Sequence, residues 1–117
     1  MKKVFICLVL ISLFLITSQS PAIAHPPSKI TTSYDPEGKT LLVVVDHKVA
    51  DPKKHFIWKV DVIKNGNIVD TKQFEEQTDN YTQKTAFVLT ESQPTDVIEI
   101  EAFCNISGKL KQKAVMR

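Results

Sequence analysis

The chain is poor in cysteine, with only Cys7 and Cys104 among 117 residues. Cys7 lies inside an apolar N-terminal run that we expect to be removed, and it comes too early in that run to be a lipid-attachment site. Cys104 is then alone, which excludes an internal disulfide. The chain also lacks any C-x-x-C pair, so it has no second cysteine cluster for an electron-transfer centre. A lone thiol in an oxidising compartment must be buried, metal-bound or open to oxidation.

The part of the chain beyond the N-terminal run has no net charge and no helical periodicity. Two of the 15 Lys and Arg residues, Lys2 and Lys3, lie in the N-terminal run, so the remaining 13 face 13 Asp and Glu residues. A neutral domain is unsuited to nucleic acid or to an anionic membrane as its main partner. Beyond the N-terminal run we find no convincing helical period and no internal repeat.

The N-terminus has the layout of a secretory signal peptide. Two lysines precede an apolar run over residues 4–16, and the small-residue site Ala22-Ile23-Ala24 follows. The run is too short to span a bilayer comfortably, so we expect cleavage after Ala24 rather than a retained anchor. Removing residues 1–24 from the 117 leaves 93, enough for one domain over residues 25–117. The sequence therefore predicts an exported protein, periplasmic or secreted, with no membrane attachment after cleavage.

The mature part divides into short apolar or alternating segments separated by turn residues, which predicts an all-β fold, most simply a seven-stranded immunoglobulin-like β-sandwich. Asp35-Pro36-Glu37-Gly38 and Asn65-Gly66 are the clearest turns; the first places Gly38 where a positive φ is tolerated, and the second favours a type I′ hairpin. The candidate strands are 29–34, 40–47, 55–64, 68–74, 81–90, 96–104 and 109–116.

Two strands show strict alternation. Phe56, Trp58, Val60 and Val62 share one predicted core face, with Lys59 and Asp61 opposite. In the sixth strand Ile98, Ile100 and Ala102 share a face with Cys104, which therefore ends a core strand on its apolar side.

Few residues outside the leader can bind a transition metal or act as a nucleophile: His25, His47, His55 and Cys104. Imidazole and thiolate donors suit iron, copper or zinc. His47 closes the second predicted strand, His55 opens the third, and Cys104 closes the sixth. Periodicity alone does not say whether these strand ends coincide.

The segment from His47 to Trp58, together with Phe103-Cys104-Asn105-Ile106-Ser107-Gly108, resembles the iron-binding domain of the superoxide reductases, the desulfoferrodoxin and neelaredoxin family. That family pairs a histidine stretch with a C-N-x-H-G motif on an immunoglobulin-like sandwich. The resemblance implies a mononuclear non-haem iron, with His47 and His55 as equatorial ligands, Cys104 as the axial ligand and His25 as a further histidine. The family's fourth histidine falls on Ser107, and its Glu-Lys pair falls on Ile23-Ala24.

By the same resemblance, the protein is a superoxide reductase-like oxidoreductase if it is active. Its substrate is superoxide or another small anion, and an external electron donor is required. Lys48, Lys53 and Lys54 would form a positive rim that attracts such an anion.

Two other functions remain open. After cleavage, His25 would be the N-terminal residue, and its α-amine and ring together could chelate copper in a non-catalytic module, with His47 or His55 completing the site. Alternatively the chain is a metal-free interaction domain, in which Cys104 is a small buried apolar residue and the histidines are solvated.

Overall fold

The computed structural model describes residues 25–116. The predicted signal peptide, residues 1–24, lies outside the described residues. The described part is all-β, as predicted from the alternating segments. Each of the seven predicted segments overlaps one strand, and no predicted end lies more than three residues from the observed one: β1 Lys29–Asp35, β2 Thr40–Asp46, β3 Ile57–Lys64, β4 Asn67–Gln73, β5 Thr82–Val88, β6 Ile98–Cys104 and β7 Lys109–Lys113.

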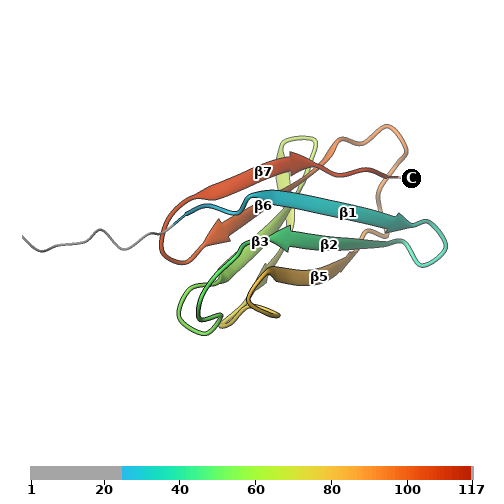
Figure 1. The fold of residues 1–117 in the computed structure, drawn as a ribbon. Helices are drawn as coiled ribbons and strands as arrows, with labels where there is room; N and C mark the ends of the chain where they lie inside the picture. Colours follow the sequence, from blue (N-terminus) through green and yellow to red (C-terminus); the bar gives the residue numbers. More distant parts are fainter. Residues whose placement is uncertain (1–24, 117) are drawn as a thin grey trace, which may run out of the picture.

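The strands form two antiparallel sheets that face each other as a sandwich (Figure 1). One sheet has the order β1-β2-β5 and the other β4-β3-β6-β7. The immunoglobulin-like seven-stranded sandwich is thus confirmed. The fourth strand pairs with β3. In a constant-type immunoglobulin domain the fourth strand instead belongs to the sheet of the first, second and fifth strands. Within residues 25–116 there is no helix that could cross a membrane.

Side chains that alternate along the strands fill the space between the sheets. β2 and β6 show the pattern most clearly, because every second residue of each is buried. The predicted apolar face of β6, including Cys104, is confirmed. The core consists of Ile30, Leu41, Val43, Val45, Ile57, Val60, Val62, Phe87, Leu89, Ile98, Ile100 and Ala102.

The predicted core face of β3 is correct for Val60 and Val62 and wrong for Phe56 and Trp58, which are half-buried outside the core. A β-bulge between Ile57 and Lys59 shifts the register of β3 against β6, so Ile57 takes the core position and Trp58 does not. The Trp58 ring is half-buried and lies 6.4 Å from the ring of Phe103, and Lys59 Nζ lies over both rings. An inserted residue moves the side chains on one side of the bulge to the opposite face of the sheet. The period of the sequence does not reveal such a bulge.

The turns were predicted in part. Asn65 and Gly66 both have positive φ, 51° and 86°, which confirms the type I′ hairpin between β3 and β4. In the first turn Lys39, with φ 50°, takes the left-handed conformation instead of Gly38. The Cβ that Gly38 lacks would lie 3.0 Å from Asp35 Oδ2, so a side chain at this position would require the Asp35 carboxylate to shift.

Antiparallel pairing brings the predicted ligand residues to one end of the sandwich. β3 begins where β6 ends, because Ile57 pairs with Cys104. β2 ends at the same end in the other sheet, and the loop from β2 to β3 crosses between the sheets there (left in Figure 1). The segment that precedes β1 enters at this end too. The strand ends at His47, His55 and Cys104 therefore coincide.

Candidate metal centre

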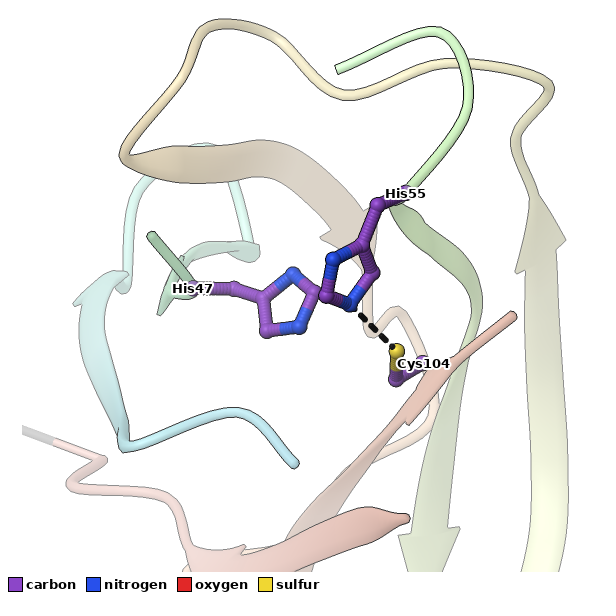
Figure 2. Close-up of side chains that lie close together, drawn as sticks. All are labelled: His47, His55 and Cys104. Carbon is purple, nitrogen blue, oxygen red and sulfur yellow. Dashed lines mark hydrogen bonds between the residues drawn. The ribbon is translucent and has the colours of Figure 1, made fainter. Parts of the chain in front are cut away.

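His55 and Cys104 are in direct contact. His55 Nε2 lies 3.1 Å from Cys104 Sγ (Figure 2). Asn105 holds the two chain segments together: its Oδ1 accepts a hydrogen bond from Phe56 N–H at 2.9 Å, and its Nδ2 donates to Lys54 O at 3.0 Å. The backbone N–H of Asn105 also donates a hydrogen bond to Phe56 O. The residues on both sides of His55 are thus tied to the residue after Cys104.

His47 follows β2 and is almost fully buried, with 1% of its surface exposed. Its backbone N–H donates to Tyr81 O, which ties the end of β2 to the loop between β4 and β5. Its ring lies between two oxygen atoms: Nδ1 is 2.8 Å from Gln77 Oε1, and Nε2 is 3.1 Å from His25 O. The ring centroids of His47 and His55 are 4.7 Å apart, nearly perpendicular, and the two rings point toward each other in Figure 2.

His47, His55 and Cys104 could hold a metal ion, because one donor atom from each lies within 4.8 Å of the others. The His55 to Cys104 distance fits shared coordination. With bonds of about 2.1 Å to nitrogen and about 2.3 Å to sulfur, two ligands lie about 3.1 Å apart at the right angle of octahedral coordination and about 3.6 Å apart at the tetrahedral angle of a zinc site. Two imidazoles and one thiolate are the donors that borderline and soft transition metals prefer, whereas calcium and magnesium prefer oxygen.

The thiol of Cys104 has one further neighbour. The backbone N–H of Ile106 lies 3.5 Å from Sγ and makes a weak donor contact to it. The Cys104 side chain is 7% exposed and, within residues 25–116, it is a free cysteine.

His25 lies beside the cluster but is not one of its three close donors. Its ring centroid is 5.0 Å from that of His47 and 5.4 Å from that of His55. Its Nδ1 lies 3.2 Å from Pro26 O, and its own carbonyl faces His47 Nε2. The structure therefore brings the third imidazole beside the other two rings, with its Nδ1 next to the carbonyl of the following residue.

One imidazole of the site, that of His55, is biased toward its neutral form. Burial, followed by the neighbouring imidazoles of His47 and His25, lowers the pKa of His55 from its ordinary value. The neutral ring that a metal ion requires is thereby favoured. Lys48, Lys53 and Lys54 are exposed on the loop between His47 and His55, as the predicted positive rim requires.

Ser107, at the position of the family's remaining histidine, is exposed in the turn between β6 and β7. Two residues at this site were not found from the sequence. Gln77 lies in an irregular loop, where no period or motif marks it. Gly108 stands in the C-N-x-H-G motif, but its role becomes visible only in space: its φ is +83°, and the Cβ it lacks would lie 2.7 Å from Pro26 Cβ.

No protein-family model, curated protein or solved structure gives a significant match to this chain. Its function is therefore inferred from its own residues.

Proposed function

We propose that the protein is an exported mononuclear non-haem iron protein of the superoxide reductase type. The observation that supports this most is the contact of His55 Nε2 with Cys104 Sγ at 3.1 Å, with His47 beside them. Residues 57 positions apart along the chain, at 47 and 104, meet at one end of the fold with the donors that the family motif uses.

His47, His55 and Cys104 would hold the ion, and His25 would join as a fourth ligand after its ring turns away from Pro26 O. Ferrous iron, when bound, supplies the electron that, with two protons, reduces superoxide to hydrogen peroxide; an external reductant then restores the ferrous state. The chain's own contribution is to supply an anionic sulfur, keep His55 neutral and present cationic lysines around the entrance. The lysine rim raises the local concentration of an anion such as superoxide.

Spectroscopy of the reconstituted protein tests this function. The mature domain is loaded with ferrous iron under argon and then oxidised, and a thiolate-to-ferric charge-transfer band is expected. The band should disappear in Cys104→Ser and weaken in His55→Ala. Val115→Ala, at an exposed position in the C-terminal segment, is a control that should leave it unchanged. Absence of the band in the wild-type protein would end the iron proposal.

Copper is the second candidate, because three imidazole rings lie within 5.4 Å of one another, centroid to centroid, at this end of the fold. A copper site built on the α-amine of His25 requires that residue to be the N-terminus. Adding one residue before His25 should then abolish tight copper binding, whereas iron binding should change little. If protein purified from its own compartment contains neither metal in stoichiometric amount, both candidates fail and a metal-free interaction domain is left.

A further inference from the structure

The side chain of Gln77 is the most heavily bonded group next to the metal centre. It is 3% exposed and makes four hydrogen-bond contacts. Its Oε1 lies 3.1 Å from Ile57 N and 2.8 Å from His47 Nδ1. Its Nε2 donates to His47 O at 2.8 Å and to Asp79 O at 3.0 Å. One carboxamide therefore connects the end of β2, the start of β3 and the loop before β5.

Three backbone groups fix which end of this carboxamide faces His47. The Ile57 N–H can only donate, so it requires the oxygen of Gln77, and the carbonyls of His47 and Asp79 can only accept, so they require its nitrogen. The opposite orientation would break all three contacts in a buried site. The atom that faces His47 Nδ1 is thus an acceptor, whatever the state of the imidazole.

An acceptor at 2.8 Å requires His47 Nδ1 to carry a proton. The neutral ring then has its lone pair on Nε2, which points away from Gln77 and toward His25 O at 3.1 Å. Two acceptors facing each other at that distance repel, and a cation at Nε2, either a proton or a metal ion, removes the repulsion. Gln77 therefore favours the tautomer that offers Nε2 to an ion, and His25 O favours a cation, either a proton or a metal ion, at that nitrogen.

The position of Gln77 is itself fixed by its backbone. The Gln77 N–H donates to Pro52 O at 2.9 Å, which ties its loop to the loop between His47 and His55. The acceptor is consequently in place before any ligand arrives. A hydrogen-bond acceptor on the non-ligating nitrogen of a metal-binding histidine orients the ring and makes the ligating nitrogen more basic.

We propose that Gln77 is a positioning residue of the metal centre, which sets the tautomer and direction of His47 so that Nε2 is the ligating atom. This inference rests on the proposed function for its role in metal binding, but the tautomer can be measured without metal. A merely structural role is the rival explanation, since Gln77 also joins three chain segments.

Gln83 provides the matched control. It is a second buried glutamine, 4% exposed, and it bonds the same loop: its Oε1 accepts from Thr78 N–H and its Nε2 donates to Lys84 O. No hydrogen bond joins it to His47 among the described residues. Gln83→Leu should therefore remove two part-buried hydrogen bonds at the same loop without changing the imidazole of His47.

The first measurement is nitrogen-detected NMR of the histidine rings in metal-free protein, at a pH above the ordinary histidine pKa. The second is titration of the protein with ferrous iron under argon. We expect His47 to be protonated at Nδ1 in the wild-type protein, in Gln83→Leu and in Gln77→Glu, which keeps an acceptor. In Gln77→Leu the proton should move to Nε2, toward His25 O, and iron affinity should fall about 10- to 100-fold. Gln83→Leu should retain wild-type affinity once equal folding is verified.

Each other outcome overturns one of the two proposals. A wild-type His47 protonated mainly at Nε2 refutes the role of Gln77, even if Gln77→Leu fails to fold. Equal loss of iron affinity in Gln77→Leu and Gln83→Leu reduces Gln77 to a structural residue. If His47 is protonated at Nδ1 but no metal binds, the tautomer assignment stands and the proposed iron site is refuted.

Discussion

Gly108 and Pro26 pack so closely that a side chain at position 108 would overlap the proline: the missing Cβ would lie 2.7 Å from Pro26 Cβ. Gly108 also accepts, through its carbonyl, a hydrogen bond from the N–H of Cys104. The same glycine therefore contacts the segment that carries His25 and the residue that supplies the thiol.

Gly108→Ala should displace the segment that carries His25. The alanine pays about 1–2 kcal/mol for its left-handed backbone and, in addition, must push Pro26 away. Gly66→Ala is the control, because its φ is also positive at 86° while nothing lies within 4 Å of the added Cβ. Denaturant unfolding should show a larger loss for Gly108→Ala, and only this variant should also weaken metal binding. Equal losses would show that Pro26 moves freely.

Ser107→His should strengthen metal binding. This residue is three positions after Cys104, where the C-N-x-H-G motif places a histidine, and its side chain is exposed, so the substitution costs little stability. An added imidazole donor should raise iron affinity at least about tenfold, the size of one favourable ligand interaction of about 1.4 kcal/mol. Ile106→His, at the exposed neighbouring position, is the control. Calorimetric titration that ranks the two variants equally would argue against the motif alignment.

Asn105→Ala should loosen His55 without removing a ligand. The side chain bonds Phe56 N–H and Lys54 O on either side of His55, and each such bond contributes about 1 kcal/mol to stability. We expect the free energy of unfolding to fall by about 1–2 kcal/mol, and iron affinity to fall as well. Asn80→Ala removes a comparable exposed bond, to Ala50 O, and should leave affinity unchanged. If both variants bind iron as the wild type does, Asn105 does not position His55.

The metal-free protein should lose stability as the pH falls through the histidine range. Because the pKa of His55 is lowered in the fold, the unfolded chain binds more protons than the folded one between that value and the ordinary 6.5. The free energy of unfolding therefore decreases as the pH drops through this window, and the penalty is complete below the folded pKa. An NMR titration should find His55 below 6.5, with a partial return toward that value in His47→Ala. A value above 6.5 would contradict the burial argument.

The strands could be predicted because burial acts on every second residue. Ile98, Ile100 and Ala102 alternate with Glu99 and Glu101, and the structure buries the first three. Asn65-Gly66 could be predicted because positive φ restricts residue choice at both positions. These signals are local, so a short stretch of sequence contains them.

The parts that escaped prediction depend on contacts between distant segments. The bulge at Trp58 adds no recognisable residue type, yet it places Ile57 rather than Trp58 in the core at the start of β3. Gln77 lies 30 residues from its partner His47 in a loop without periodicity. Strand periodicity did not say whether His55 and Cys104 meet, and only the family resemblance implied it. The antiparallel pairing of β3 with β6 places the two residues side by side.

The three donors belong to both halves of the sandwich. His47 extends β2 of one sheet, Cys104 ends β6 of the other, and His55 lies on the connection between them. An ion shared by these residues would act as a cross-link between the layers, so that separating the sheets at this end requires its release. Resistance to heat and to proteolysis should then increase with the concentration of free metal, over the whole domain rather than in one loop.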